Sequence, residues 1–279
     1  MINNGLIKQW MSSPVITVSP DTTLREAREI LSEEKIRALP VIKNRKLVGI
    51  ITRRGLLRLD LSFLADESWH QQARLEQEKV SEVMTVSPLT TRPDSLMPKA
   101  ARIMLENKIT ALPVIEKGAL VGILTNSDFL RFIIQEYSSL KKVIKVSNYM
   151  TDEVVTIERD TNMLEIHRLM GVKRIRSLPV MEGDQLVGIV TRTDLMSSDP
   201  SRLTSSEDKD LSLKILTQPV EKIMSNPVIT ISPDAVLTEA AQLMLDNKLH
   251  SLPVVDENKK LVGIITESDL FLMIVQKFF

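Results

Sequence analysis

The chain has 279 residues, of which 36 are Lys or Arg, 36 are Asp or Glu and 43% are apolar. This balance is typical of a core-forming globular protein and gives no overall attraction to nucleic acid or to an anionic membrane. Because the chain has no Cys and only three His, it offers no disulfide, no thiolate metal site and no Cys nucleophile, and a His-based metal site is not expected.

One unit of about 45 residues occurs four times with almost fixed internal spacing, which indicates a repeat architecture. In every copy a Met is followed ten residues later by an Asp and twenty-eight residues later by the Leu of a Leu-Pro-Val motif. A Gly follows that Leu by ten residues in three copies and by eleven in the fourth, where residues 256–260 lengthen a turn. The repeated positions are Met11, Met84, Met150 and Met224; Asp21, Asp94, Asp160 and Asp234; Leu39, Leu112, Leu178 and Leu252; and Gly49, Gly122, Gly188 and Gly263.

Within a copy, the hydrophobic pattern changes in a fixed order. A short β-branched segment, residues 15–18 in the first copy, predicts a strand, and a turn with Pro and Asp then opens an amphipathic helix. Two apolar runs follow, residues 39–42 and 47–51, and the polar turn between them predicts two adjacent strands. A second helix follows Thr52, so each copy is a β-α-β-β-α unit. The inward helix positions are expected to be Leu24, Ala27 and Leu31; Met97, Ala100 and Met104; Met163, Ile166 and Met170; and Leu237, Ala240 and Met244.

Three short strands and two helices cannot bury both faces of a sheet, so the copies are expected to pair through their sheets. We predict an α/β (α+β) protein with two modules, residues 1–137 and 138–279. The four copies span residues 10–58, 83–132, 149–197 and 223–275. Three connectors join them: a charged, helical stretch at 56–79, a partly apolar helix at 130–147 and a polar loop at 196–219.

The repeated motifs, from Met-Ser/Thr through Leu-Pro-Val and Leu-Val-Gly-Ile to Thr-x-Ser/Thr-Asp, resemble the CBS domain, whose tandem pairs are called Bateman modules. The layout is similar to that of the γ regulatory subunit of AMP-activated protein kinase, which carries four such repeats. The resemblance implies two Bateman modules, a pseudo-symmetric disc as one possible arrangement, and ligand sensing. It also implies adenosine compounds such as AMP, ADP, ATP or S-adenosylmethionine as ligands, bound in clefts between paired repeats. Fold does not fix function, so each site is argued on its own residues.

The Thr-x-x-Asp motif at the start of the second helix has two interpretations. It forms a capping box if the Thr and the Asp satisfy backbone groups at the helix N-terminus. It forms a ligand site if the carboxylate accepts the ribose hydroxyls, the role that the resemblance implies, while Thr and Ser side chains donate toward sugar or phosphate. The positions concerned are Thr125, Ser127 and Asp128; Thr191, Thr193 and Asp194; and Thr266, Ser268 and Asp269.

The first copy departs from this motif, because Gly55 stands where the other copies have Asp. Gly55 supplies neither a ribose acceptor nor an acidic cap. We therefore expect this corner to hold no nucleoside, or to hold one in a different pose.

Further ligand positions follow from the resemblance. Arg37, Arg176 and His250 lie two residues before the Leu-Pro-Val motif of copies one, three and four. The resemblance implies that they bind nucleotide phosphates. It places Arg37 near Asp128, Arg176 near Asp269 and His250 near Asp194. Solvated strand-edge side chains are the alternative. Thr90, Thr156 and Thr230 match the first-strand position that borders the base, with plain β propensity as the alternative.

We expect a non-catalytic regulatory protein, because the sequence has no Ser/His/Asp motif, no Gly-rich phosphate loop and no His-Glu-x-x-His. A ligand-free scaffold for protein assembly is the alternative, favoured by the degenerate first copy and by the apolar residues 270–275. No covalent cofactor, nucleic acid or membrane partner is expected. An unknown regulated protein is expected as partner, and both a monomer and a homodimer are open. Because residues 1–10 lack a signal-peptide pattern and residues 270–279 are shorter than the ~20 that a membrane helix needs, we expect a cytoplasmic protein.

Overall fold

The structure is a computed structural model that describes residues 5–53, 55–56, 77–137, 144–197 and 217–278. The chain divides into two compact units, and their described residues lie in Met1–Ser139 and Phe271–Phe279 for unit 1 and in Leu140–Leu270 for unit 2. Most of the connectors expected at 56–79 and 196–219, and residues 138–143 of the third connector, lie outside the described residues. The boundary between modules 1–137 and 138–279 stays a prediction.

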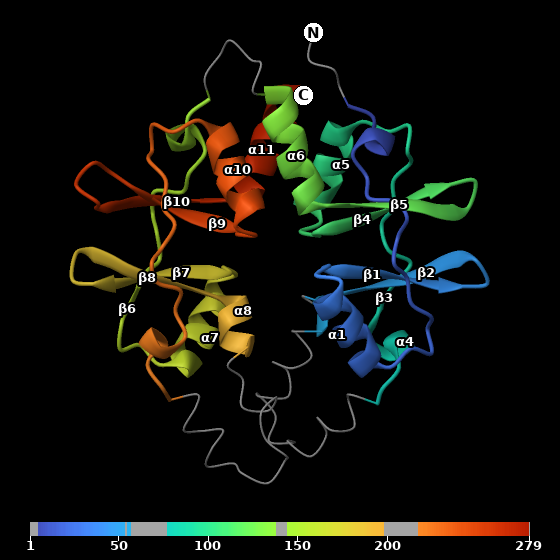
Figure 1. The fold of residues 1–279 in the computed structure, drawn as a ribbon, viewed down its shortest axis with the longest axis horizontal. Helices are drawn as coiled ribbons and strands as arrows, with labels where there is room; N and C mark the ends of the chain where they lie inside the picture. The colour runs from blue at the N-terminus through green and yellow to red at the C-terminus, as the bar shows by residue number, and fades with distance from the viewer. Residues whose placement is uncertain (1–4, 54, 57–76, 138–143, 198–216, 279) are drawn as a thin grey trace. The chain divides into compact units, whose positions relative to one another are not determined.

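The four copies contribute their elements in the same order, shown in colour along the chain in Figure 1. In unit 1 these are η1 (Ile7–Gln9), α1 (Leu24–Glu33), β1 (Ala38–Lys43) and β2 (Lys46–Thr52), then α4 (Val80–Val83), β3 (Thr85–Val86), α5 (Met97–Glu106), β4 (Ala111–Glu116), β5 (Ala119–Thr125) and α6 (Asn126–Tyr137). The other two copies give η3 (Val146–Asn148), β6 (Ile157–Glu158), α7 (Met163–Lys173), β7 (Ser177–Glu182), β8 (Gln185–Thr191) and α8 (Arg192–Ser197), then η5 (Val220–Lys222), α10 (Leu237–Asp246), β9 (Ser251–Val255), β10 (Leu261–Thr266) and α11 (Glu267–Phe278).

The predicted hairpins are present in all four copies. Each Leu-Pro-Val strand pairs antiparallel with the Val-Gly strand that follows it. The turn after β1 places Asn44 and Arg45 at φ of 51° and 63°, a left-handed pair that matches the twist of a tight hairpin. In the fourth copy, the longer turn closes on Asp256, whose Oδ1 accepts from the backbone N–H groups of Asn258 and Lys260.

The first strand of each copy is shorter than its sequence suggests. Only Ile157–Glu158 forms a strand with more than one ladder pair, parallel to β7. The other copies make single parallel bridges, from Val18 to Val41, from Thr91 to Val114 and from Ile231 to Val254.

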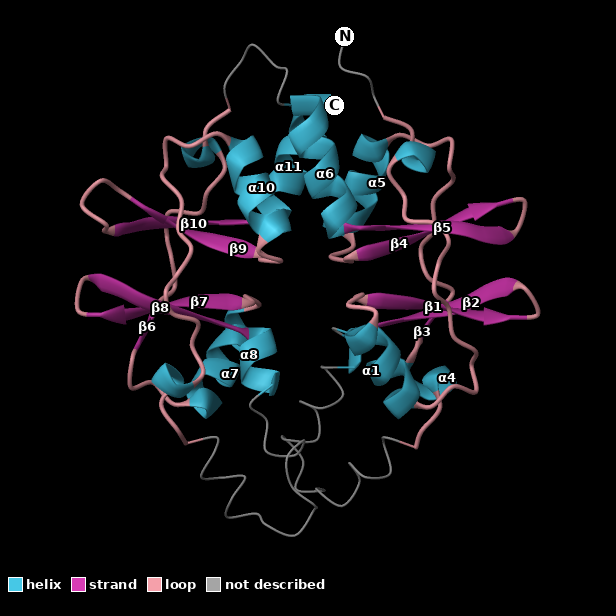
Figure 2. Cartoon of the chain, in the orientation of Figure 1, coloured by secondary structure: helices cyan, strands magenta, loops and turns pink. Residues whose placement is uncertain are grey.

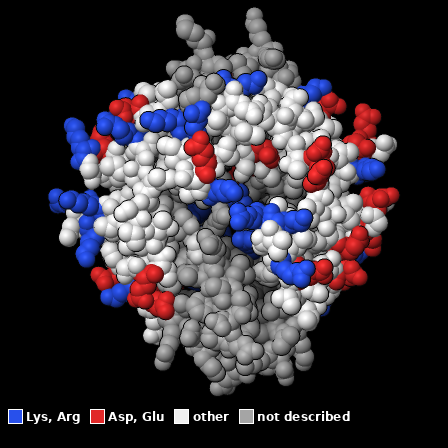
Figure 3. Space-filling view, turned by 180° about the vertical axis from the view of Figure 1, so that it is seen from behind, with Lys and Arg blue, Asp and Glu red and all other residues white. Residues whose placement is uncertain are grey.

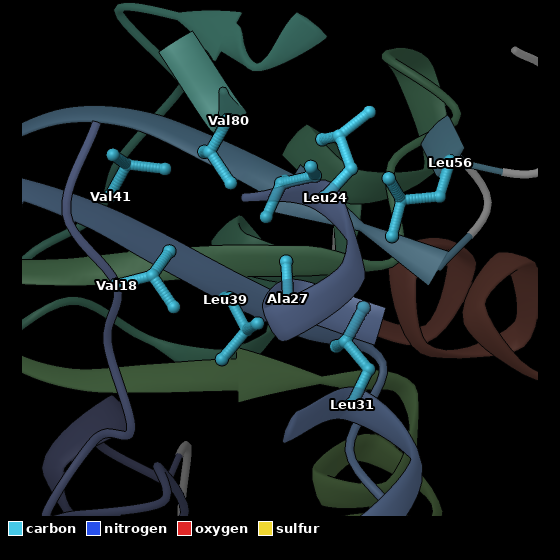
Figure 4. Packing of buried hydrophobic residues seen from close by; sticks show 9 residues of the cluster. Val18, Leu24, Ala27, Leu31, Leu39, Val41, Leu56 and Val80 are labelled. Carbon is cyan, nitrogen blue, oxygen red and sulfur yellow. The ribbon is translucent and has the colours of Figure 1, made fainter. Parts of the chain in front are cut away.

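The predicted inward positions of the first helices are confirmed, because all twelve are at most 3% exposed. Figure 4 shows how this stripe packs in the first copy, with Leu24, Ala27 and Leu31 facing Leu39 and Val41 of the hairpin. Val80 joins the same core although it lies in α4, at the beginning of the second copy. The core of one copy is therefore completed by a segment of its partner.

Packing between paired copies also explains why each copy has a Met and a Gly at fixed positions. A Cβ built on Gly49 would overlap Sδ of Met84, and a Cβ on Gly122 would overlap Sδ of Met11. Unit 2 repeats the arrangement, since Met224 covers Gly188 and Met150 covers Gly263. Each Met thus packs on the Gly of its partner copy, and no side chain fits at that Gly without moving the Met.

Within each unit, the two copies meet through their hairpins. Figure 2 shows the hairpins of unit 1 lying between α1 and α5, and those of unit 2 lying between α7 and α10. In unit 1 the contact is apolar, formed by Ala38, Ile50, Ala111 and Ile123. In unit 2, the hydroxyl groups of Ser177 and Ser251, the residues equivalent to the two Ala, form a hydrogen bond of 2.7 Å. The sheet-to-sheet pairing expected within a module is therefore present in both units.

Candidate functional site

The Thr-x-x-Asp corners share one geometry at the start of the second helix. In each, Oδ2 of the Asp accepts from both the backbone N–H and the hydroxyl of the Thr three residues earlier. The distances are 2.6 and 2.9 Å for Thr125 and Asp128, 2.7 and 2.7 Å for Thr191 and Asp194, and 2.7 and 2.8 Å for Thr266 and Asp269. The capping interaction is therefore present in three copies, and it uses one oxygen of each carboxylate.

The hydrogen bonding of the second carboxylate oxygen, Oδ1, differs between unit 1 and unit 2. Asp128 is fully buried and its Oδ1 also accepts from Nη2 of Arg131. Asp194 and Asp269 are only partly buried. Among the described residues, no hydrogen bond reaches Oδ1 of Asp194, and both bonds to Thr266 end on Oδ2 of Asp269. The corners of unit 2 therefore present a carboxylate oxygen that can accept a sugar hydroxyl without breaking the cap.

Burial changes the acidity of two of these carboxyl groups. Desolvation raises the pKa of Asp128 above its ordinary value of 3.8, although the hydrogen bonds from Thr125 and the charge of Arg131 oppose the shift. Desolvation also raises the pKa of Asp269, against the hydrogen bonds from Thr266. Each carboxyl therefore gains from a further donor, because such a donor stabilises its charged form.

The first copy keeps only half of the cap. The backbone N–H of Gly55 donates to Oγ1 of Thr52 at 3.0 Å, and no acid returns the interaction at this position. The lack of nucleoside at this corner stays a prediction.

The expected phosphate contacts stand at the strand ends next to these corners. Arg37, Arg176 and His250 directly precede β1, β7 and β9, and the carbonyl oxygen of each accepts a backbone hydrogen bond from the residue that opens the second helix of the same copy. These donors are Arg53, Arg192 and Glu267, at 2.9, 2.9 and 3.1 Å. The expected proximity of Arg37 to Asp128, of Arg176 to Asp269 and of His250 to Asp194 stays a prediction.

Glu267 is a buried acidic residue that the sequence motifs did not predict as part of the site. Its side chain is 2% exposed and its Oε2 lies 3.0 Å from Nδ1 of His250, whose side chain is 36% exposed. The signal was in the repeat itself, because the same position carries Arg53, Asn126 and Arg192 in the other copies. The fourth copy therefore carries a buried carboxylate at a position that is cationic in two other copies.

The strand ends of unit 2 come together through Ser177 and Ser251. Ser177 pairs across its hairpin with Thr191, and Ser251 pairs with Thr266. Because the two Ser hydroxyls bond each other, both Thr-x-x-Asp corners lie beside one central contact. Arg176 and His250 immediately precede these Ser residues. The structure thus places the backbone of Thr191 and of Thr266 opposite the two Ser residues that join copies three and four.

The first-strand Thr residues border open surface. Thr90 and Thr156 are exposed and Thr230 is partly buried, and each directly precedes the residue that bridges to the Leu-Pro-Val strand. The apolar residue before this Thr is exposed in three copies. These side chains are Ile16, Leu89 and Ile229, at 39, 47 and 39%. The sequence pattern predicted them only as strand residues.

Ser127 and Thr193 are partly buried and Ser268 is exposed, all three on the first turn of a second helix. Positive and negative side chains are scattered over the face seen in Figure 3, in keeping with 36 charges of each sign. Among the described residues there is no group of three or more His, Asp or Glu placed to hold a metal ion. No described helix is long and apolar enough to cross a bilayer.

The comparisons with known proteins agree with this repeat. The family model of the CBS domain matches residues 7–62, 80–135, 146–200 and 220–275. Protein MJ1225 of Methanocaldococcus jannaschii is 28% identical over 278 residues, 95% of this chain and 97% of MJ1225. Its crystal structure, reported as that of a proposed archaeal homologue of the AMPK γ subunit, has a TM-score of 0.80 at 25% identity and covers 96% of this chain and 99% of MJ1225.

Two other solved structures are similar to this chain. An uncharacterized conserved protein from Pyrococcus horikoshii has a TM-score of 0.68 at 23% identity, covering 97% of this chain and 100% of the other. The CBS-pair protein CBSX2 from Arabidopsis thaliana has a TM-score of 0.41 at 30% identity, covering 48% of this chain and 98% of CBSX2, and it has also been solved in complex with AMP. The four matched segments span most of the sequence. The protein therefore belongs to the CBS domain family, with four CBS repeats in one chain.

Proposed function

We propose that this protein is a non-catalytic sensor that binds adenosine-containing ligands of the AMP, ADP, ATP or S-adenosylmethionine type between paired CBS repeats. The observation that carries the proposal is the state of Asp194 and Asp269. Each uses Oδ2 to cap its own helix and is only partly buried, so Oδ1 is placed to accept a ribose hydroxyl. The caps fix both carboxylates in position before any ligand arrives, which lowers the entropy lost on binding.

The surroundings of these corners suit the rest of such a ligand. Thr230 and Thr156 stand at the first strands, and Ile229 leaves an apolar surface beside Thr230. Arg176 and His250 supply hydrogen-bond donors at the strand ends. Sugar acceptor, apolar surface and donors together match the three chemical parts of a nucleotide.

Regulation would follow from occupancy. A ligand that binds between two copies contacts both, so it favours the arrangement of the copies in which those contacts form. A partner protein that binds this arrangement better would be regulated in turn, since coupling between two sites is reciprocal. The repeats offer this coupling because each copy completes the core of its partner, as Val80 does in unit 1.

A ligand-free scaffold is the second candidate, and one surface favours it. Two apolar side chains of α7 are exposed, Leu164 at 57% and Val172 at 73%. The residues equivalent to Leu164 in the other three copies are Arg25, Pro98 and Thr238, and those equivalent to Val172 are Glu33, Glu106 and Asp246. The apolar residues 270–275, expected to support this alternative, do not. Leu270, Phe271, Met273 and Ile274 are at most 4% exposed and belong to the core, Val275 is partly buried, and Leu272 is 38% exposed.

A thermal-shift panel of AMP, ADP, ATP and S-adenosylmethionine separates the two functions. A ligand at 100 times its Kd stabilises the protein by about 2.7 kcal/mol, which is readily measured. We expect at least one compound to raise Tm, and Asp194→Ala and Asp269→Ala to reduce that rise. Asp184→Ala is the matched control, because Asp184 is exposed in the turn of the β7–β8 hairpin. A flat panel contradicts the sensor and leaves the scaffold. A rise that both site variants keep contradicts the site.

A further inference from the structure

The Thr-x-x-Asp positions of unit 1 differ from those of unit 2 in what a ligand can reach. In copy one Gly55 stands in place of the Asp. In copy two the Asp is present, but Asp128 is 0% exposed. Asp194 and Asp269, at the same position in unit 2, are only partly buried. Unit 1 therefore has this carboxylate in one copy, and there it does not reach the surface.

The side chain of Arg131 occupies the second oxygen of Asp128. Nη2 of Arg131 donates to Oδ1, while the backbone N–H and the hydroxyl of Thr125 already donate to Oδ2. Both oxygens of the carboxylate are therefore bonded from within α6 and from the residue that precedes it. Because the bond from the guanidinium group is charge-assisted, it is stronger than the bond that a neutral sugar hydroxyl forms in its place.

The position of Arg131 is not basic in unit 2. It carries Ser197 in copy three and Leu272 in copy four. Leu272 is 38% exposed and has no donor to offer Asp269. Arg58 stands at this position in copy one, where Gly replaces the Asp. The combination of the Asp with an Arg three residues later therefore belongs to copy two.

The contact between Arg131 and Asp128 can open without unfolding α6. The Arg131 side chain is 49% exposed, whereas that of Asp128 is 0% exposed. The long Arg side chain can turn into water and keep its charge hydrated, while the hydrogen bonds from Thr125 hold Asp128 in place. A buried carboxylate without a partner is costly, so opening is favourable only when another donor replaces the guanidinium group.

On the basis of the function proposed above, we infer that Arg131 closes the corner of copy two by occupying the carboxylate that a ribose hydroxyl needs. Unit 1 then stays without nucleoside at ligand concentrations that fill unit 2. The apparent affinity of the closed corner is reduced by the fraction of molecules in which Arg131 has turned away. Ligand enters unit 1 only at higher concentration, and Arg131 determines how much higher.

Isothermal titration with adenosine, AMP and S-adenosylmethionine, which share the ribose, tests this inference. Arg131→Leu puts the residue of copy four into copy two. With each compound that binds the wild type, this variant is expected to bind one more equivalent, or to bind about tenfold more tightly in its weakest step, because one charge-assisted hydrogen bond no longer competes. Leu272→Arg makes the reverse exchange and is expected to lose one equivalent or about tenfold in affinity.

Matched variants separate closure of the corner from other effects. Asp128→Ala combined with Arg131→Leu is expected to abolish the gain, because the ribose acceptor is then missing. Arg25→Leu makes the same chemical change at an exposed residue of α1 and is expected to leave every titration unchanged. Adenosine carries no phosphate, so an effect that it shares with AMP does not come from attraction between Arg131 and a phosphate.

The inference is overturned if the wild type binds ligand and Arg131→Leu leaves the titration unchanged. Weaker binding by Arg131→Leu also overturns it, because Arg131 then contacts the ligand instead of excluding it. If Arg131→Leu does not fold, Leu272→Arg decides, and unchanged binding by that variant overturns the inference. If neither these compounds nor any other in the thermal-shift panel binds the wild type, the proposed function itself fails.

Discussion

In unit 1 the strand ends that meet between paired copies are apolar, Ala38 with Ala111, whereas in unit 2 a hydroxyl pair, Ser177 with Ser251, joins them. The carboxylates at the nearby corners follow the same division. Asp128 of unit 1 is fully buried and bound by Arg131, whereas Asp194 and Asp269 of unit 2 are only partly buried. The four copies thus share one scaffold, and the residues between paired copies make that contact apolar in unit 1 and polar in unit 2.

The largest expected effect tests whether the two units are equal in their cores. Leu112 and Leu178 stand at the same position of the Leu-Pro-Val strand, one in each unit, and both are fully buried. Replacing either Leu by Ala removes packing and leaves a cavity, so each change is expected to lower the unfolding free energy by about 2–5 kcal/mol. Chemical denaturation of the two variants measures it. If the two losses of unfolding free energy differ by more than about 2 kcal/mol, the cores of the two units are not equivalent. The units would then differ within the copies themselves as well as at the contact between paired copies.

The next effect tests the interface between paired copies. Ser177→Ala removes one hydroxyl and leaves Ser251, which is 5% exposed, without that partner, so a loss of about 1 kcal/mol is expected. Changing both Ser to Ala removes the whole pair and is expected to restore most of that stability. In unit 1, Ala38→Ser places a hydroxyl in an apolar cluster and is expected to cost about 1–3 kcal/mol.

A double-mutant cycle on the Ser177 and Ser251 pair gives the coupling energy directly. Zero coupling would mean that the hydroxyl contact contributes nothing to the pairing of the copies.

Much of the fold could be predicted because it depends on the pattern of apolar and turn-forming residues close together in the sequence. The stripe of Leu24, Ala27 and Leu31 and its three counterparts follows the helical period, and turns such as that at Asn44 and Arg45 separate two apolar runs. The Thr-x-x-Asp corners could be predicted as caps for the same reason, since Thr125 and Asp128 interact within one turn of chain.

What could not be predicted depends on contacts between segments far apart in sequence. The spacing of Met84 and Gly49 was visible, but only the structure shows that the Met of one copy covers the Gly of its partner. Burial of Glu267 was invisible for the same reason, because its environment comes from packing.

Backbone conformation after the first helices was also hidden. Four basic residues adopt a left-handed conformation there, a role that glycine usually takes. They are Lys35, Lys108, Arg174 and Lys248, with φ of 54, 53, 56 and 56°.

The smallest expected effect concerns pH and compares the buried carboxyl of unit 1 with that of unit 2. Desolvation raises the pKa of Asp128 and of Asp269 in the folded protein. The unfolded state therefore loses these protons at lower pH than the folded state. Each group contributes stability that is fully present below its unfolded pKa and is lost as pH rises through the folded pKa.

Asp128→Asn and Asp269→Asn remove the titrating group, so each is expected to flatten the fall in unfolding free energy as pH rises from about 4, the ordinary carboxyl range. The flattening is expected to be larger for Asp128, which is fully buried, than for Asp269. Denaturant titrations at a series of pH values measure the slope, which is the readout even if the absolute stability of a variant falls. Exposed Asp21 is the matched control with the opposite sign, because its hydrogen bond from Lys79 lowers its pKa and favours the folded state as pH rises. A slope that Asp128→Asn leaves unchanged would mean that the hydrogen bonds from Thr125 and the charge of Arg131 fully offset the effect of burial on this carboxyl.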